Sequence, residues 1–566
     1  MIAMQVLSAA DMKACDRATT EQFGIPSIDL MRNAAAAVAG FAREQFPLAR
    51  RVTVLCGTGN NGGDGMMAAR LLSDAGLEVT TLLLGEPEKL KGDTALAWSE
   101  LNNPIYRKVR VVAHAPESAK QDDAFSTDLI VDALFGTGFR PPLPSLALAV
   151  LERVQRCTCP VLSVDLPSGW LADETSATPS GTVFHPTDED LSVGTPVFPA
   201  DAVITFTAPK PAHVFGQLTR RWDQPVVIAP IGSPDDVIRS QRNLHWAGSS
   251  LAIVQAVRAA AANKGNFGHV LVVGGSFGSA GGKAGAPSMA SLAALRAGAG
   301  LVTAAVPAPA LPVVSSIAPE LMTWPLAATN EGQAAAENLA PDRIAALTAG
   351  KTVLAIGPGL GQSAETAKFA IGLLSATKIP AVIDADALNI LASDTSRLTE
   401  LAKGRTLVLT PHPGEMARLI GSTVAEVQAN RLEVASSFAQ RMGVTLVLKG
   451  ARTLIAHPDG RVAVNTSGNP GMAKGGSGDV LTGLIAGLLA QYSDDPVHAV
   501  EAAVYLHGLA ADLAVQEADE HTVLATDSLA YLAQAYKSRL HRFEVGGKNG
   551  YVWLQGGIAC SSRMPL

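Results

Sequence analysis

Short apolar runs alternate with longer, partly polar stretches along most of this chain. In its first part the stretches 8–46 and 66–75 predict helices, because they are rich in Ala and other helix-forming residues. The apolar runs that predict strands there are 51–56, 78–84, 128–133, 161–165 and 202–207. Strands that alternate with helices are typical of a parallel, doubly wound α/β sheet.

A second, longer series of the same kind begins near residue 245. The stretch 286–298 predicts a helix. The apolar runs that predict strands in this part are 270–274, 302–306, 352–356, 381–383, 407–409 and 445–448. Prolines, glycines and polar residues interrupt the pattern between 230 and 248. We therefore predict two α/β domains, over residues 1–235 and 245–540.

Two segments fit neither series. Residues 170–200 are rich in Thr, Ser, Pro and Asp, which predicts a long loop. The tail after about residue 540 has no clear period, so we expect it to be loosely ordered.

Composition narrows the class of function. A chain of 566 residues is too long for one core, and a net charge of −7 argues against nonspecific binding to nucleic acids or anionic membranes. The five cysteines are scattered without metal-ligand spacing, and no signal peptide or bilayer-spanning run is present. We therefore expect a cytoplasmic homo-oligomer that acts on small molecules and has no nucleic-acid or membrane partner.

A glycine-rich run, Gly57–Gly65, directly follows the first predicted strand. It satisfies GxGxxG in a strand-to-helix context, which favours a nucleotide pyrophosphate site. The oxygens of Asn60, Asn61 and Asp64 also suit a hard cation. The alternative is a set of Asx turns that cap the helix.

Polar residues also close two later strands of this domain. Asp132 precedes the run Gly136–Pro142, and Asp165 precedes Ser168. Residues just past the carboxyl ends of strands line the ligand crevice of an open α/β sheet. We therefore expect Asn61, Asp132, Asp165 and Ser168 to converge.

The runs GTGNNGGDG, DALFGTG and DLPSG together resemble the N-terminal domain of NAD(P)HX epimerases, which is Rossmann-like and would cover about 1–235. The resemblance implies a K⁺ ion held by Asn61, Asp132 and Ser168, and it implies that Asp165 lies beside the reactive ring. It implies that hydrated NAD(P)H binds to Asn60, Asn61, Gly62, Gly63, Asp64, Gly136, Thr137, Gly138, Phe139, Arg140, Pro141, Pro142 and Asp165.

The implied chemistry is physically reasonable. Carbon 6 of the hydrated nicotinamide is a hemiaminal centre, so assisted loss and return of its hydroxyl changes its configuration. Asp165 is the candidate acid/base.

Two features of the sequence depart from the family: Arg32 stands where an acidic residue is usual, and the loop 170–200 looks inserted.

The run Gly475–Asp479 precedes the apolar stretch 480–489, which predicts a helix. Glycine amides at a helix amino terminus make an anion site, and a carboxylate inside such a site suggests phosphoryl chemistry rather than simple binding. The alternative is a glycine-rich turn in which Asp479 is the helix N-cap.

Five further motifs follow predicted strands in this half of the chain. They are Lys264–Ser276, Gly357–Gly361, Asp384–Asn389, Thr410–Glu415 and Lys449–Thr453. Each has a simple alternative, such as a tight turn for Gly357–Gly361, a rigidly held loop residue for His412 and a solvated strand end for Lys449. Their common position after strands predicts one shared crevice.

This array resembles the ADP-dependent NAD(P)HX dehydratases, whose fold is ribokinase-like. The resemblance implies that Asp479 is catalytic, that Mg²⁺ and ADP are used, and that the hydrated cofactor contacts Ala286, Gly359 or Gly361, and His412. The residues implied to bind the adenine nucleotide are Lys449, Gly450, Ala451, Arg452, Thr453 and Gly478. Lys283 departs from the family, in which a Tyr often precedes the small residues.

The implied dehydration is a phosphoryl transfer followed by an elimination. Asp479 would take the proton of the C6 hydroxyl, the oxygen would accept the terminal phosphoryl of ADP, and the ring nitrogen would expel phosphate.

The leading hypothesis is a bifunctional repair enzyme that epimerises R- and S-NAD(P)HX and dehydrates the S form, yielding AMP and phosphate. Two alternatives stay open: a ribokinase-like vitamin or sugar kinase with a regulatory N-terminal domain, and a non-enzymatic nucleotide-binding module in the first half.

Overall fold

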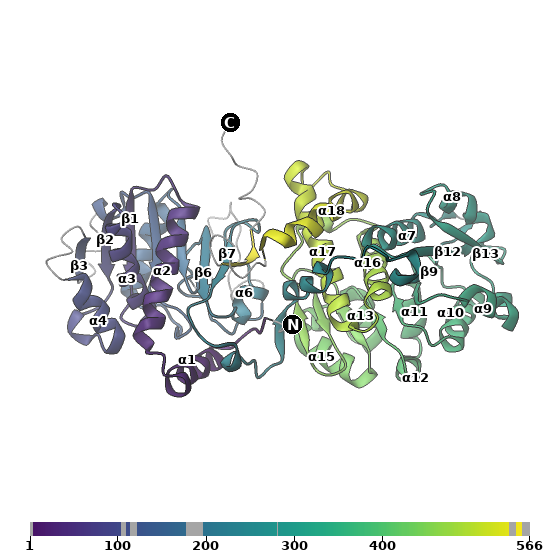
Figure 1. Cartoon of the computed structure of the whole chain (residues 1–566), viewed down its shortest axis with the longest axis horizontal. Helices are drawn as coiled ribbons and strands as arrows, with labels where there is room; N and C mark the ends of the chain where they lie inside the picture. Colours follow the sequence, from purple (N-terminus) through teal and green to yellow (C-terminus); the bar gives the residue numbers. More distant parts are fainter. Residues whose placement is uncertain are drawn as a thin grey trace. The chain divides into compact units, whose positions relative to one another are not determined.

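The computed structural model describes residues 4–102, 109–113, 122–176, 196–279, 281–542 and 551–556 (Figure 1). These residues divide into two compact units. The N-terminal unit holds 4–244 together with 551–556, and the C-terminal unit holds 245–542. The division falls between Leu244 and His245, where the sequence pattern is interrupted.

The N-terminal unit is built on an eight-stranded sheet with the strand order β20-β7-β6-β5-β4-β1-β2-β3. All neighbours pair in parallel except β20, which pairs antiparallel with β7. The order 3-2-1-4-5-6 within it is that of a Rossmann sheet, which confirms the predicted fold. The strands are β1 (Arg51–Cys56), β2 (Glu78–Leu83), β3 (Val109–Ala113), β4 (Leu129–Ala133), β5 (Val161–Val164), β6 (Ala202–Phe206), β7 (Val226–Ala229) and β20 (Val552–Gln555).

Helices cover both faces of this sheet. The α-helices are α1 (Ala9–Phe23), α2 (Ser27–Gln45), α3 (Asn60–Asp74), α4 (Gly92–Leu101), α5 (Ser145–Arg156) and α6 (Pro211–Phe215). One buried cluster joins α2, α3 and α4 to Val52 and Val54 of β1, and another joins α5 to Leu55 of the same strand. Successive side chains of β1 therefore pack into the cores on opposite faces of the sheet, because side chains alternate between the two faces along a strand.

The expectation of a loose tail is wrong for residues 551–556. Val552–Gln555 forms β20 on the edge of the N-terminal sheet. Tyr551 and Trp553 meet the ring of Phe41 edge-on, with ring centroids 5.4 Å and 6.0 Å apart. The local sequence of β20 holds no information about its pairing with β7, which lies far away along the chain. Most of the predicted loop 170–200 lies outside the described residues.

The C-terminal unit carries a ten-stranded sheet with the order β13-β12-β9-β14-β15-β16-β17-β18-β19-β8. Neighbours from β13 to β17 pair in parallel, whereas β18 pairs antiparallel with both β17 and β19. Its strands are β8 (Leu244–Trp246), β9 (His269–Val273), β12 (Leu301–Pro307), β13 (Met322–Leu326), β14 (Val353–Ile356), β15 (Ala381–Ile383), β16 (Leu407–Leu409), β17 (Thr445–Leu448), β18 (Leu454–Ala456) and β19 (Val462–Val464). A separate ribbon pairs β10 (Phe277–Gly278) with β11 (Gly281–Gly282).

Helix α16 is the central helix of this unit. It is buried from Val480 to Ala490 and packs on α7 and on strands β9, β14 and β15. The α-helices of the unit are α7 (Gly285–Ala297), α8 (Leu311–Ser315), α9 (Pro341–Thr348), α10 (Ala364–Ala376), α11 (Ala385–Ala392), α12 (Arg397–Ala402), α13 (Pro413–Ile420), α14 (Val424–Ala429), α15 (Arg431–Met442), α16 (Ser477–Gln491), α17 (Pro496–Glu517) and α18 (Ala525–Arg542). In the described part of the chain, none of these helices or those of the N-terminal unit has the length and apolarity needed to cross a bilayer.

Helix starts differ from the sequence prediction. Helix α3 begins at Asn60 rather than 66, and α16 begins at Ser477 rather than 480. In both places glycines lower intrinsic helix propensity, so the pattern hides a first turn that tertiary packing stabilises. The stretch 8–46 is two helices, because Gly24 takes a left-handed conformation just before Pro26.

Candidate active sites

The N-terminal unit contains a cavity of about 450 Å³ beside the carboxyl ends of β1 and β4. From these neighbouring strands the chain proceeds to opposite sides of the sheet, which is the switch point where open α/β sheets bind ligands. The residues that line the cavity are Met12, Asp16, Thr20, Ser27, Leu30, Met31, Ala34, Thr58, Gly59, Asn60, Asn61, Asp64, Asp93, Leu134, Phe135, Gly136, Thr137, Gly138, Phe139, Asp165, Phe206, Lys210 and Ile231. Its size is within the range of small-molecule sites.

Two glycines let the turn after β1 close tightly. A Cβ placed on Gly62 would lie 1.9 Å from the carbonyl oxygen of Gly57, and one placed on Gly57 would lie 2.1 Å from that of Leu134. Helix α3 then begins with Gly59 as its N-cap and has no side-chain cap. The alternative of Asx turns that cap this helix is therefore wrong.

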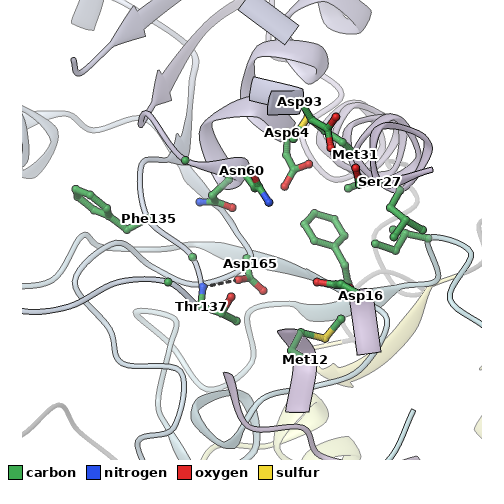
Figure 2. A pocket seen from close by; sticks show the side chains of 18 of the residues that line it. Met12, Asp16, Ser27, Met31, Asn60, Asp64, Asp93, Phe135, Thr137 and Asp165 are labelled. Carbon is green, nitrogen blue, oxygen red and sulfur yellow. Dashed lines mark hydrogen bonds between the residues drawn. The ribbon is translucent and has the colours of Figure 1, made fainter. Parts of the chain in front are cut away.

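Asp165 lies in the floor of the cavity, directly after β5 (Figure 2). Its Oδ2 accepts a hydrogen bond of 2.9 Å from the amide of Thr137, and its Oδ1 accepts one of 2.8 Å from the hydroxyl of Thr205. The Nζ of Lys210 lies 3.0 Å from the same Oδ1. The backbone of Asp165 has a φ of 65°, an uncommon conformation for a residue other than Gly, and such strain is frequent at functional sites.

Lys210 and His213 fix the position of Asp165. The ammonium of Lys210 is buried and also donates to the hydroxyl of Thr205 at 2.7 Å. The Nδ1 of His213 accepts the amide of Lys210 at 2.9 Å, so its Nε2 carries the proton that is donated to the carbonyl of Asp165 at 2.7 Å. Burial lowers the pKa of His213 to about 4, which keeps this imidazole neutral.

The carboxyls of the cavity differ in their proton affinity. Burial favours the neutral form of Asp165, but Lys210, His213 and the Thr205 hydroxyl together outweigh it and lower the pKa of Asp165 below its usual value. Burial, together with the charge of Asp165, raises the pKa of Asp64 well above its usual value. Asp64 therefore holds its proton more tightly than Asp165 does.

Asp132 and Ser168 lie fully buried next to this floor. The Ser168 hydroxyl donates to Oδ1 of Asp132 at 2.6 Å, and the Ser168 amide donates to Oδ2 at 2.8 Å. Burial raises the pKa of Asp132 to about 6, and its hydrogen bonds with Ser168 oppose that rise. Asn61 is near Asp165, since a Cβ on the intervening Gly136 would lie 2.6 Å from Asp165 Oδ2 and 3.3 Å from Asn61 Cγ.

Most residues expected from the sequence at this site do line the cavity. Seven are not among the lining residues described above: Gly62, Gly63, Asp132, Arg140, Pro141, Pro142 and Ser168. Three that sequence reasoning missed are Asp16, Lys210 and His213. Lys210 carried a usable signal, because it follows the buried strand β6 by a few residues, as the other site residues follow theirs.

The C-terminal unit has its own switch point, between β9 and β14. The turn after β14 needs three residues with positive φ: Gly357 at 123°, Gly359 at 63° and Gly361 at 86°. A Cβ on Gly357 would lie 1.8 Å from the carbonyl oxygen of Asp384, and one on Gly359 would lie 3.3 Å from the Cβ of Ala286. The structure thus places Gly359 against Ala286, at the amino terminus of α7.

Lys449 is the centre of a carboxylate cluster at the same end of the sheet. Its Nζ lies 3.0 Å from Asp384 Oδ1 and 3.8 Å from Glu415 Oε2. The hydroxyl of Thr482 donates to the other oxygen of Asp384 at 2.8 Å. A Cβ on Gly478 would lie 3.3 Å from Lys449 Nζ, which puts the start of α16 beside the cluster. Lys449 is therefore no solvated strand end.

Asp479 is the third residue of α16, whose N-cap is Gly476 and which has no side-chain cap. The interpretation of Asp479 as an N-cap is therefore wrong. Burial raises the pKa of Asp479 to about 7, the charges of Asp384 and Asp386 add to that rise, and Lys449 opposes it. A carboxyl with a pKa near neutrality is suited to take up and release a proton.

His412 caps helix α13. Its Nδ1 accepts the amides of Gly414 and Glu415 at 3.0 Å and 3.4 Å, while Glu415 accepts the amide of His412 at 2.8 Å. This reciprocal pair fixes the imidazole with half of its side chain exposed and its Nε2 3.6 Å from Glu415 Oε1. The expectation of a rigidly held loop residue is met, and the exposed edge stays accessible to a ligand.

The segment after β17 forms a turn held by Arg431 from α15. Its guanidinium donates to the carbonyl groups of Leu448, Lys449 and Arg452 at 3.3 to 3.4 Å. Arg452 takes a φ of 56° and donates to the carbonyl of Thr466 at 3.0 Å. The side chain of Arg452 therefore supports the turn from within.

Arg431 and Thr482 had no place in the sequence prediction of this site. Asp384, Asp386 and Glu415 stood in motifs expected at the shared crevice, but no individual role was expected for them. Asp386 accepts hydrogen bonds from the Gly361 amide at 2.9 Å and from Gln362 at 2.7 Å, so it orders the glycine turn. Asp384 carried a signal, since it directly follows β15, whereas nothing in the local sequence marks Arg431 or Thr482.

Two family models match the chain. Residues 27–212 match the YjeF-related protein N-terminus, and residues 270–534 match NAD(P)H-hydrate dehydratase. The chain is 40% identical over 548 residues to the bifunctional NAD(P)H-hydrate repair enzyme Nnr of Moorella thermoacetica, with 94% of this chain and 96% of that protein covered. The protein of the same name from Escherichia coli is 35% identical over 555 residues, covering 96% of this chain and 95% of the relative.

Among solved structures, the ADP/ATP-dependent NAD(P)H-hydrate dehydratase of Bacillus subtilis, co-crystallised with ATP and Mg²⁺, is 33% identical. The match covers 52% of this chain and 96% of the Bacillus subtilis chain, with a TM-score of 0.43.

Proposed function

Because the chain belongs to the family of bifunctional NAD(P)H-hydrate repair enzymes, we propose that its two switch-point sites divide that repair between them. The N-terminal cavity epimerises R- and S-NAD(P)HX, and the C-terminal carboxylate cluster dehydrates the S form with ADP. The two alternatives raised by the sequence, a vitamin or sugar kinase and a non-enzymatic N-terminal module, are not favoured. The cytoplasmic location and the homo-oligomer expected from the sequence stay predictions.

The observation that carries the dehydratase assignment is the position of Asp479 beside Lys449. Asp479 takes the proton of the C6 hydroxyl, whose oxygen then accepts the terminal phosphoryl group of ADP. Amides at the start of α16 face the developing negative charge. The lone pair of N1 then forms an N1=C6 double bond as the C6–O bond breaks and phosphate leaves. Loss of a C5 proton to water forms the C5=C6 double bond and restores the dihydronicotinamide. AMP is the second product.

A divalent cation fits this site only together with the nucleotide. Asp479 and Asp384 supply carboxylate oxygens, but the described residues contain no group of three or more His, Cys, Asp or Glu side chains arranged for a metal. Mg²⁺ is usually held by one or two carboxylates and substrate phosphates. When bound, it neutralises charge on the transferred phosphoryl group.

The N-terminal assignment depends on Asp165, which Lys210 keeps ionised and the Thr137 amide orients. An ionised carboxylate beside C6 accepts the proton of the water that returns to the ring. We propose that Asn60, Asp64 and the 136–139 turn bind the hydrated nicotinamide nucleotide around it.

A K⁺ site next to this cavity is supported by two observations. Asp132 is fully buried, and no cationic side chain is among the groups that shift its pKa. The Nδ2 of Asn61 is buried without a hydrogen-bond partner in the described structure, and turning this amide presents its oxygen instead. Asn61, Asp132 and Ser168 supply oxygens, and the cation would offset the charge of Asp132.

Thermal unfolding tests this K⁺ site without reference to activity. At equal ionic strength, the melting temperature of the whole protein should be higher in KCl than in LiCl or tetramethylammonium chloride. A concentration ten times Kd stabilises by about 1.4 kcal/mol, a shift of about 2–4 °C. Asp132→Asn should abolish the difference, while Asp236→Asn, at an exposed position of the same unit, should keep it. Equal melting temperatures in all three salts would contradict the site.

The proposed function as a whole is tested with purified R- and S-NADHX and with ADP or ATP in turn. We expect absorbance of the reduced cofactor to return with S-NADHX and ADP at once, and with R-NADHX only as fast as it is epimerised. NADPHX in parallel reports the preference between the two cofactors. Accumulation of a stable phosphorylated product, with no reduced cofactor, would instead support the kinase alternative.

A further inference from the structure

One face of helix α1 borders the N-terminal cavity. The proposed function described above does not use any residue of this helix. Met12, Asp16 and Thr20 all line the cavity. They are spaced by four residues, so they form one stripe along the helix. Asp16 is the ionisable member of this stripe. Figure 2 shows Asp16 and Asp165 bordering the same open space, one from α1 and the other from the turn after β5.

Asp16 and Asp165 sense each other's charge although they come from different elements. Partial removal from water at the wall of the cavity raises the pKa of Asp16 to about 6, Lys210 opposes this rise, and the charge of Asp165 adds to it. Asp64 and the Cys15 thiol, whose pKa values are both raised by burial, are the other ionisable groups of this region coupled to Asp16. The two carboxyls thus have pKa values shifted in opposite directions, as in acid and base pairs of enzymes.

We propose that Asp16 is a second catalytic residue of the epimerase site and works as the acid where Asp165 works as the base. This inference rests on the proposed epimerase function of the cavity. Asp16 gives its proton to the C6 hydroxyl, and the C6–O bond breaks to release water while the lone pair of N1 forms the N1=C6 double bond. Water then adds to the opposite face of C6, and Asp165 accepts its proton.

The step balances without any further reagent. One water leaves and one returns, and one proton moves from Asp16 to Asp165. In the reverse direction the two residues exchange roles. Two carboxyls are needed because the hydroxyl leaves from one face of the ring and returns to the other, which one fixed side chain does not reach equally.

Asp64 is less suited to this exchange than Asp16. Burial raises its pKa well above the usual value, so it releases its proton less readily than an ordinary carboxyl. Such a carboxyl donates a hydrogen bond to the substrate but does not give up its proton readily. Asp16 is also more exposed than Asp64, so a substrate that enters the cavity meets it.

The test is the pH dependence of epimerisation by the full chain, with the uncatalysed rate subtracted. In the native protein kcat/KM for R to S conversion of NADHX should fall as the pH rises above about 6, because the acid form of Asp16 is lost. Asp16→Asn should lower kcat by about 10²-fold or more and remove this fall. Glu21→Gln, which neutralises an exposed carboxylate on the same helix, should behave as the native protein.

Dehydration of S-NADHX with ADP is measured on the same preparations and should be unchanged in both variants, which shows that the C-terminal unit is intact, and a native thermal unfolding profile shows that the N-terminal unit is folded. Native-like epimerisation by Asp16→Asn would overturn the assignment. A loss confined to KM, with the fall above pH 6 retained, would also overturn it, since that is the result of a structural role. If the native protein does not interconvert the epimers, the proposed function of the N-terminal unit is wrong, and the role of Asp16 with it.

Discussion

Replacing Asp479 with Asn should lower the turnover of S-NADHX with ADP by about 10²–10⁴-fold, the usual contribution of a general base. Asn keeps the shape of the side chain but accepts no proton. The loss should lie in kcat rather than in the KM for ADP, because Asp479 acts on the hydroxyl that attacks the nucleotide. A coupled assay of NADH formation measures both constants.

The pH profile of the native protein gives a second reading of the same residue. The pKa of Asp479 is raised to about 7 by burial and by its acidic neighbours. A base must be ionised to accept a proton, so dehydration should rise with pH up to about 7 and then level off. Asp479→Asn should lose this rise along with the activity.

Two controls make the result specific. R to S conversion by the N-terminal unit should be unchanged in Asp479→Asn, which excludes general unfolding. Asp494→Asn, at an exposed position just beyond α16, should dehydrate at the native rate. Retention of native turnover by Asp479→Asn would show that another group takes the proton.

Much of the fold was predictable because parallel sheets are buried on both faces. Strands such as β15 and β16 are continuous apolar runs, and their bounds were predicted without error. Strands β18 and β19 are equally short and buried but were not predicted, and β20 is separated from its sheet in the sequence by the whole C-terminal unit. Local periodicity holds no information about such distant pairing.

The sites were predictable where a polar residue closes a strand. Asp132 is the penultimate residue of the buried strand β4, and Asp165 and the glycines after β14 directly follow buried strands; the structure brings each to a switch point. Asp16 and Arg431 were missed because they lie within helices, where an acidic or basic residue usually marks a solvated face. Only the packing of α1 and α15 against the turns shows that these side chains face a site.

The interpretation of Asp479 as a cap failed for a related reason. An Asp before an apolar run is a common N-cap, and the sequence fits that reading as well as a catalytic one. Packing of α16 against α7 extends the helix back to Ser477, which moves Asp479 inside the first turn. The change of two or three residues in a helix start therefore decides between two functions.

Replacing Asp165 with Asn should affect both catalysis and stability. Epimerisation should fall by about 10²–10⁴-fold, because the ionised acceptor of the proton is removed. The buried ammonium of Lys210 would also lose its counter-charge, which costs about 3–5 kcal/mol of unfolding free energy. Thermal or urea unfolding measures this loss, and an assay of R to S conversion measures the catalytic one.

The sign of the pH dependence follows from the lowered pKa of Asp165. A carboxyl whose folded pKa lies below its unfolded value of about 3.9 stabilises fully above that value, and the stabilisation is lost as the pH falls through the folded pKa. The native protein should therefore lose this contribution in acid, and Asp165→Asn should show no such loss.

The double variant Asp165→Asn, Lys210→Met separates the two effects. It removes both charges of the buried pair, so most of the stability lost in Asp165→Asn should return, since an uncompensated charge costs more than an absent pair. Epimerisation should stay absent, because no carboxylate accepts the proton. Equal stability of the single and double variants would show that the pair with Lys210 is not the source of the loss. Epimerisation by the double variant at the native rate would remove Asp165 from the reaction, because a stable fold with neither charge would then suffice for it.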